Sequence, residues 1–372
     1  DRAQALVRSV GEGVVAALAS RKVAVLRARG TLTGPDSVAL TGEERRELRA
    51  ESIILATGTR WERPSFPGIP DERILTADQV QRLRLAPASA LVLAGGPSQA
   101  DFALEYAFLL AAAGSEVTLA VPRSRLLDGL DPALDEVARA ALADAGITVL
   151  LGATLRKGDG ATATVAHRDG TAGVAAEAIV VPDPRRHSTE GLGLEAAGLP
   201  ATDTVAIDAG CRTAVPSILA AGDVAGGPML TAAALEMGRV AGLNATGGEA
   251  RARLGALPHV LHLQPEVAWA GMTEEAARAA GYDVCVGLVD LSFNPKAVTL
   301  GQRGGVLKLI GERELGEVLG VHAVGPGAEE IVALAAAAMQ AENTLDDLAA
   351  TVHWHPSMAE SLADAARRAL RG

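Results

Sequence analysis

Cysteine, aromatic side chains and excess positive charge are all scarce in this chain of 372 residues. Its two cysteines, Cys211 and Cys285, lie far apart in the sequence, which excludes a CxxC or CxxxxC redox pair and a cysteine-rich metal site. Aromatic residues make up only 2%, so Ala, Val and Leu must form the core. A net charge of −11 gives no sign of a basic surface for nucleic acid or an anionic membrane.

An apolar segment long enough to span a membrane and a signal sequence are also missing. We therefore expect a soluble, cytoplasmic protein without a membrane partner. The hydrophobic share of 49% and the charged share of 21% are typical of packed globular domains. A chain of this length suggests two or three such domains.

The first candidate ligand site follows a short buried strand. Residues 51–56 form an apolar run that leads directly into Thr57-Gly58. Because no side chain larger than Thr stands in the way after Ala56, backbone amides there can approach a ligand. A plain strand and turn would explain the segment equally well. Upstream, the pattern predicts an amphipathic helix over 1–20 and strands over 23–26 and 37–40.

A strand, a glycine turn and a helix then predict the start of a dinucleotide-binding unit, in which the helix N-terminus faces a pyrophosphate. The elements are a strand over 90–94, a turn at Gly95-Gly96, a helix over 99–113 and a second strand over 116–121. The G-x-G-x-x-G fingerprint is incomplete, because residues 94–99 keep only its middle glycine, Gly96. A nucleotide fold that binds weakly or not at all stays an alternative.

The residues after the second of these strands bear on the choice of nucleotide. Where an acidic residue would bind the ribose of NAD, the sequence has Arg123 and Arg125, which suit a 2′-phosphate better than a ribose diol. The unit continues with a helix over 132–145 and strands over 147–151 and 177–181. The last strand ends at Pro182-Asp183-Pro184, with two prolines where a nucleotide fold would favour small, flexible residues.

A further candidate site follows the strand over 217–221. Gly222-Asp223 ends this strand, and a helix begins near Met229. An Asp at the carboxyl end of a buried strand can accept hydrogen bonds from ligand hydroxyls, while a helix N-terminus offers free amides. An isolated Gly-Asp is also common in ordinary turns.

The C-terminal part predicts an α+β domain with an antiparallel sheet, because its strands follow one another locally and its helices gather after them. Strands are expected over 266–270, 284–290, 305–310 and 318–324, and helices over 273–280, 328–341, 345–351 and 358–370. The helix over 329–340 is apolar enough to lie in an interface.

The chemistry of the chain is expected to centre on His355-Pro356-x-x-x-Glu360. A carboxylate five residues after an imidazole can hold one ring nitrogen, so that the other is free to take and return a proton. A proline beside a histidine can equally mark only the start of a helix.

Taken in order, these motifs resemble those of the pyridine nucleotide–disulfide oxidoreductases, the class that contains dihydrolipoamide dehydrogenase and glutathione reductase. The resemblance rests on 56–58, Gly95-Gly96, 189–194, 221–223 with Met229-Leu230, Pro265-Glu266 before 271–275, 320–322 and the final His355-Pro-x-x-x-Glu360. The pattern His353-x-His355-Pro is closer to the dihydrolipoamide dehydrogenases than to the glutathione reductases.

The resemblance implies an α/β flavoprotein fold with two dinucleotide-binding domains, a partial FAD domain and an inserted NAD(P) domain, and a C-terminal α+β dimerisation domain. The implied parts are 1–86 and 187–252 for FAD binding, 87–186 for NAD(P) binding and 253–372 for the interface. It also implies a homodimer whose active site is shared between the subunits.

Cofactors and residue roles follow from the same resemblance. FAD would contact Ala56, Thr57, Gly58, Gly222, Asp223, Met229, Leu230 and Thr231, with Asp223 on its ribityl chain. NAD or NADP would contact Gly95, Gly96, Arg123 and Arg125. His355 would serve a small dithiol or disulfide substrate as the acid–base, and Glu360 would orient it.

Two family elements are missing from the sequence: the opening glycine fingerprint that holds the adenosine diphosphate of FAD, and the CxxxxC disulfide. We therefore expect an N-terminally truncated FAD-dependent NAD(P)H dithiol/disulfide oxidoreductase that is inactive by itself. A non-catalytic paralogue that serves as a dimerisation or scaffold module stays open. So does an NAD(P)H:quinone-type reductase, in which His355 would be unnecessary.

Overall fold

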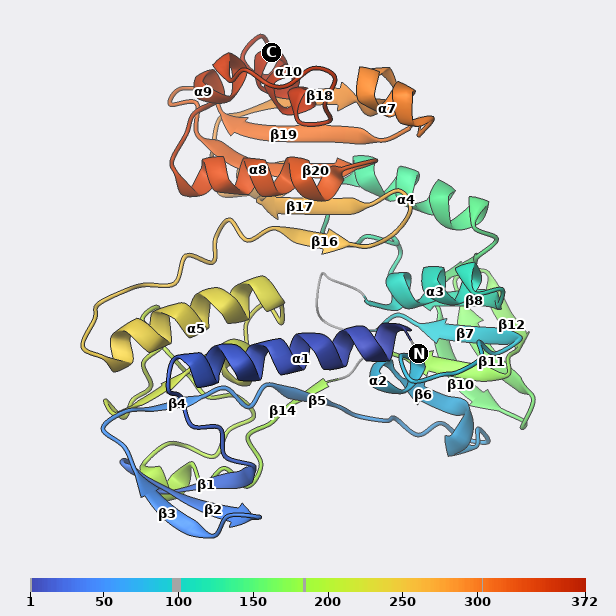
Figure 1. Cartoon of the computed structure of the whole chain (residues 1–372). Helices are drawn as coiled ribbons and strands as arrows, with labels where there is room; N and C mark the ends of the chain where they lie inside the picture. The colour runs from blue at the N-terminus through green and yellow to red at the C-terminus, as the bar shows by residue number, and fades with distance from the viewer. Residues whose placement is uncertain (1, 96–101, 183–184, 303) are drawn as a thin grey trace. The chain divides into compact units, whose positions relative to one another are not determined.

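The computed structural model describes residues 2–95, 102–182, 185–302 and 304–372 (Figure 1). The chain divides into two compact units. Unit 1 comprises Asp1–Gly58, His187–Gly226 and Met237–Arg251, and unit 2 comprises Thr59–Arg186, Gly227–Glu236 and Ala252–Gly372. Among the described residues, no helix is both long and apolar enough to cross a membrane.

Unit 1 contains a long helix and two small sheets. Helix α1, Arg2–Ser20, confirms the amphipathic helix that the sequence predicts. The strands are β1 (Ala28–Gly34), β2 (Ser37–Gly42) and β3 (Arg46–Arg49) in an antiparallel sheet, and β4 (Ile53–Leu55) paired in parallel with β15 (Ile218–Ala220). Leu32, Ile53 and Ile218 share one core, so the two sheets pack together.

The strand expected over 23–26 is wrong, because the ladder starts only at Ala28. The register of the hairpin explains the difference, since Ala28 lies opposite Gly42 and Leu32 opposite Val38. β2 ends at Gly42, so it offers no backbone partner to residues before Ala28.

A five-stranded sheet occupies the first part of unit 2, and its neighbouring strands are parallel, as the predicted βαβ pattern requires. In spatial order the strands are β6 (Ile74–Thr76), β13 (Ala178–Val181), β7 (Ser89–Leu93), β8 (Glu116–Val121) and β9 (Thr148–Leu151). The helices are α2 (Ala77–Val80), α3 (Phe102–Ala112) and α4 (Pro132–Asp144).

Two further strand pairings were not predicted. They are an antiparallel sheet of β10 (Thr154–Gly158), β11 (Thr162–His167) and β12 (Gly170–Ala175), and the pair of β5 (Thr59–Trp61) with β14 (Arg185–His187). In β11 the fully buried side chains are Ala163 and Val165, which alternate with Thr and Ala. Alternation between such small residues is too weak a hydrophobic pattern to identify a strand.

The C-terminal part of unit 2 is the antiparallel α+β arrangement that the sequence predicts. In spatial order its strands are β16 (His259–Leu261), β17 (Val267–Gly271), β20 (Val318–Val324), β19 (Val306–Glu312) and β18 (Val284–Asp290). Its helices are α6 (Glu274–Ala279), α7 (Pro295–Leu300), α8 (Ala328–Gln340), α9 (Leu345–Ala350) and α10 (Glu360–Ala369).

Helices α8 and α10 bury apolar faces in the core that contains the sheet residues Leu307 and Val321. α10 lies so close to β18 that a Cβ at Gly287 would collide with the Ala365 carbonyl oxygen. Glycine at this position therefore allows the close approach that positions the start of α10, where Glu360 lies. That α8 belongs to an interface stays a prediction.

Candidate functional site

The carboxyl ends of two paired strands bring two of the predicted turns together in unit 1. In the parallel pair of β4 and β15, Leu55 lies opposite Ala220, and the Ala221 amide donates to the Leu55 carbonyl at 3.0 Å. Residues 56–58 after β4 and residues 221–223 after β15 therefore lie at the same edge of the sheet. Ligands of open α/β sheets bind at such an edge.

His187 and Ser188 connect these two turns, although the sequence analysis did not single them out. Thr57 Oγ1 donates to the Ser188 carbonyl at 2.9 Å, and the Ser188 amide donates to the Gly58 carbonyl at 2.9 Å. His187 Nδ1 donates to the Asp223 carbonyl at 2.5 Å. Ser188 is 131 residues from Thr57 in the sequence, so no local pattern could have predicted the connection.

The geometry of this edge fits a ligand with hydroxyl and phosphate groups. Gly58 and Gly222 have φ of +66° and +73°, which a side chain would strain, so the backbone there stays open to a ligand. The half-buried Asp223, in the 3-10 helix Gly222–Ala225, brings a carboxylate that can accept hydrogen bonds from hydroxyls. The predicted Met229, Leu230 and Thr231, at the start of helix α5 (Thr231–Ala245), belong to unit 2 and not to this edge.

A second edge of this kind lies at the carboxyl ends of β7 and β8 in unit 2. The Ala94 amide donates to the Ala120 carbonyl at 2.9 Å, and Gly95 follows as an exposed residue. Gly96, the other predicted glycine of this turn, lies outside the described residues. After β8, Arg123 is half-buried and Arg125 Nη2 donates to the Leu130 carbonyl at 2.9 Å. The two arginines thus follow the strand where the sequence analysis expected them.

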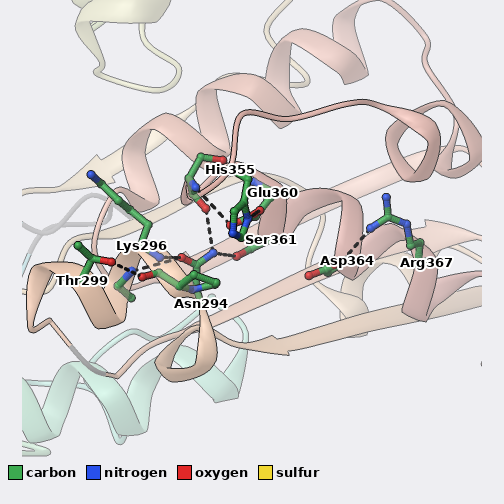
Figure 2. A network of polar contacts seen from close by, with 11 residues as sticks. Asn294, Lys296, Thr299, His355, Glu360, Ser361, Asp364 and Arg367 are labelled. Atoms are coloured by element: carbon green, nitrogen blue, oxygen red, sulfur yellow. Dashed lines mark hydrogen bonds and ion pairs between the residues drawn. The ribbon is translucent and has the colours of Figure 1, made fainter.

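The predicted acid–base pair forms a direct contact in unit 2. His355 Nδ1 lies 2.9 Å from Glu360 Oε2, and the two side chains are 69% and 21% exposed (Figure 2). Because the carboxylate can only accept, the neutral ring carries its proton on Nδ1 and presents Nε2 as an acceptor. An exposed Nε2 with a carboxylate behind the ring is the arrangement of a general base.

Glu360 has a second task, which the sequence analysis missed. Its Oε1 accepts from the Ser357 amide at 3.2 Å, and Ser357 Oγ accepts from the Glu360 amide at 3.3 Å. This exchange is the reciprocal pattern of a capping box, for which Ser357-x-x-Glu360 is the sequence signal. One carboxylate oxygen of Glu360 therefore contacts the helix start and the other contacts the imidazole, so the geometry is compatible with both interpretations of the motif.

The two cysteines are free thiols and both are buried, as expected for core residues. Cys211 Sγ donates to the Met237 carbonyl at 3.4 Å, and burial raises the pKa of the Cys285 thiol. Neither has the exposure of a reactive thiol. Among the described residues, no group of three His, Cys, Asp or Glu side chains could hold a metal ion.

The chain is similar to known proteins over both its N-terminal and its C-terminal part. The family model for pyridine nucleotide-disulphide oxidoreductase matches residues 2–238, and the model for the dimerisation domain of the same family matches residues 257–366. The dihydrolipoyl dehydrogenase of Thermus scotoductus is 34% identical over 97% of this chain and 78% of its own length. That of Geobacillus stearothermophilus is 30% identical over 98% and 78%.

Solved structures agree with these matches. LpdA from Mycobacterium tuberculosis superposes with a TM-score of 0.87 at 27% identity, over 99% of this chain and 82% of its own. The HOCl-induced flavoprotein disulfide reductase RclA from Escherichia coli reaches a TM-score of 0.81 at 25% identity, over 93% and 79%. The mixed α/β fold with a C-terminal dimerisation domain is therefore shared with flavoprotein reductases.

These findings favour the interpretation as a pyridine nucleotide–disulphide oxidoreductase over a scaffold module or a quinone-type reductase. Enzymes of this kind use FAD and NAD(P)H, and the dimerisation-domain match supports a homodimer. The chain belongs to the pyridine nucleotide–disulphide oxidoreductases, a family of flavin-dependent enzymes.

Proposed function

We propose that this chain carries the acid–base and cofactor-binding parts of a dihydrolipoamide dehydrogenase-like enzyme, an FAD-dependent NAD(P)H dithiol/disulfide oxidoreductase. The observation that carries the proposal is the contact of 2.9 Å between His355 Nδ1 and Glu360 Oε2 on an exposed imidazole. The names of the relatives, dihydrolipoyl dehydrogenases, support a small dithiol as the substrate.

Cofactor contacts are assigned to the two sheet edges. FAD, when bound, supplies a two-electron acceptor for the dithiol and a two-electron donor for the nicotinamide. We assign it to Ala56, Thr57, Gly58, Gly222, Asp223, Met229, Leu230 and Thr231. We assign NAD or NADP to Gly95, Gly96, Arg123 and Arg125. The domains proposed accordingly are 1–86 with 187–252 for FAD, 87–186 for NAD(P) and 253–372 for the interface.

His355 would transfer protons to and from the dithiol as its acid–base. Oxidation of a dithiol to a disulfide releases two electrons and two protons, and thiolates rather than thiols are the reacting species. Nε2 of His355 would accept one of these protons, and Glu360 would stabilise the imidazolium that forms. In the shared active site proposed for the dimer, this pair would serve the dithiol of the partner subunit.

The sequence supplies the base but no accessible cysteine pair, because Cys211 and Cys285 are both buried. A test therefore joins this chain to the opening segment of a family member, with its glycine fingerprint and CxxxxC. We expect such a joined protein to reduce NAD(P)⁺ with dihydrolipoamide. His355→Ala should lower this turnover about 10²- to 10⁴-fold, the usual scale for a general base.

His167→Ala is a matched control, because His167 lies in β11, away from the His355 loop, and it should leave the rate unchanged. Turnover that His355→Ala does not alter would remove the histidine from the mechanism. If the joined protein reduced quinones and His355→Ala left that rate unchanged while dithiols were not oxidised, the quinone-type reading would replace ours.

A further inference from the structure

Asn294 is a buried polar residue that the sequence analysis did not single out. It lies directly before helix α7, its exposed fraction is 6%, and its side chain makes four hydrogen bonds (Figure 2). Its Oδ1 accepts from the Lys296 amide at 2.8 Å and from the Ala297 amide at 3.3 Å. The oxygen therefore caps α7.

The nitrogen of the same amide reaches a distant part of the chain. Asn294 Nδ2 donates to the Ser357 carbonyl at 2.9 Å and to Ser361 Oγ at 2.8 Å. These partners are 63 and 67 residues away in the sequence, and Ser361 is buried. Both amide hydrogens are thus used: one bond holds the segment that joins His355 to α10, and the other holds the first turn of α10.

A continuous series of contacts leads from this amide to the imidazole. Asn294 holds the Ser357 carbonyl, the Ser357 amide donates to Glu360 Oε1, and Glu360 Oε2 holds His355 Nδ1. Ser357 is the residue through which both sides of the series pass. Displacing its peptide would therefore move the carboxylate that selects the ring tautomer.

We propose that Asn294 is a positioning residue, which fixes the Ser357 turn and through it the orientation and tautomer of His355. The catalytic meaning of this contact rests on the proposed function of His355, but the contact itself does not. Asparagine suits the position because one planar amide supplies an acceptor for the α7 cap and two donors for the turn.

Substitutions at Asn294 can separate these two tasks. Asn294→Asp keeps an acceptor for the α7 cap and removes both donors, and its carboxylate would repel the Ser357 carbonyl. Asn294→Ser is a second variant that retains a capping oxygen, for use if the buried carboxylate prevents folding. Thr273→Ala is the matched control, because it removes the side-chain cap of another helix, α6.

The measurement is ¹⁵N NMR of the histidine side chains in the chain as it exists, at alkaline pH, with the His355 signals assigned through His355→Ala. We expect the unsubstituted chain to show His355 mainly protonated at Nδ1. In Asn294→Asp or Asn294→Ser the ratio of Nδ1–H to Nε2–H tautomers should fall about two- to ten-fold, the scale of one lost hydrogen bond. Thr273→Ala should leave the ratio unchanged.

An unchanged ratio in both Asn294 variants would overturn the proposal, since the turn would then hold Glu360 without the amide. An equal fall in Thr273→Ala would overturn it as well, because any lost helix cap would have the same effect.

In the joined enzyme, Asn294→Asp should lower kcat about ten- to a hundred-fold with a smaller change in KM. A tautomer shift together with dithiol turnover that is insensitive to His355→Ala would uphold the positioning contact and reject the proposed function.

Discussion

Unit 2 holds two charged clusters that differ in the solvent exposure of their side chains. In one, Lys308 Nζ donates to Asp131 Oδ2 at 2.6 Å and to Glu274 Oε2 at 2.7 Å, and the Lys308 and Asp131 side chains are only 12% and 3% exposed. Asp131 caps α4 and Lys308 lies on β19, so this cluster joins the parallel sheet region to the antiparallel one. In the other, at the start of α10, the imidazole of His355 is 69% exposed and the Glu360 side chain 21%.

The difference in exposure is one reason why we propose a structural role for the first cluster and a chemical role for the second. Burial alone would lower the pKa of Lys308, but its hydrogen bonds to Asp131 and Glu274 outweigh this and raise it. The hydrogen bond from Lys308, followed by that from Arg278, lowers the pKa of Glu274. Both groups therefore stay charged through the neutral range and cannot exchange protons there.

The largest effect is expected when the buried cluster loses its only lysine. Lys308→Met should destabilise unit 2 by about 3–5 kcal/mol, because two carboxylates are left without their shared cation. Urea unfolding followed by tryptophan fluorescence measures this, since Trp61, Trp269 and Trp354 all belong to unit 2. Glu360→Gln is the matched change in the exposed pair and should cost less than about 1 kcal/mol.

The loss of stability caused by Lys308→Met should depend on pH in a predictable way. The folded pKa of Glu274 is lowered, so its contribution is present above pH 4.5 and is lost as the pH falls through the folded pKa. The folded pKa of Lys308 is raised, so its contribution is present below pH 10.5 and is lost as the pH rises through the folded pKa. The difference between Lys308→Met and the unsubstituted chain should shrink in acid, and a difference that grew there would refute the assignment.

The two clusters also show what sequence patterns can predict. The pair of His355 and Glu360 was predictable because its partners lie five residues apart on one turn. Lys308 and Asp131 are 177 residues apart, and nothing local marks either as a partner of the other. Long-range contacts of this kind, including that of Asn294 with Ser357, depend on how strands and helices pack.

Strands were predicted well where the apolar residues are large. The runs that became β18 and β20 contain several Val and Leu residues, and their predicted bounds match the structure. β11 and β12 were missed because Thr, Ala and Gly dominate them, and β10 because Leu155 is its only large apolar residue. The expected strand over 23–26 was apolar enough, but strands need a backbone partner, and β2 does not extend to it.

A medium effect is expected where α10 packs on β18, which tests whether the exposed pair depends on buried packing. Gly287→Ala should cost about 1–3 kcal/mol, because the new methyl group would collide with the Ala365 carbonyl. It should also lower the Nδ1–H fraction of His355, since α10 begins at Glu360. Gly255→Ala meets nothing within 4 Å and should change stability by less than about 1 kcal/mol. Equal effects of the two substitutions would show that α10 tolerates displacement.

The smallest effect concerns a histidine that differs from His355 in burial. His322 is fully buried, lies opposite Lys308 in the sheet, and donates its Nε2–H to the Met272 carbonyl at 2.9 Å. Burial lowers the pKa of His322 below the ordinary 6.5. As the pH falls below 6.5, the unfolded chain therefore binds a proton at this ring that the folded chain does not bind. The contribution of His322 to stability should therefore be complete above pH 6.5, and stability should fall below that pH by at most about 1.4 kcal/mol per pH unit.

The slope is measured by urea unfolding followed by tryptophan fluorescence at several pH values. His322→Gln should flatten it, although His259, whose pKa burial also lowers, would leave part of the slope. A slope unchanged in His322→Gln would mean that the folded protein binds the proton at this ring in spite of its burial.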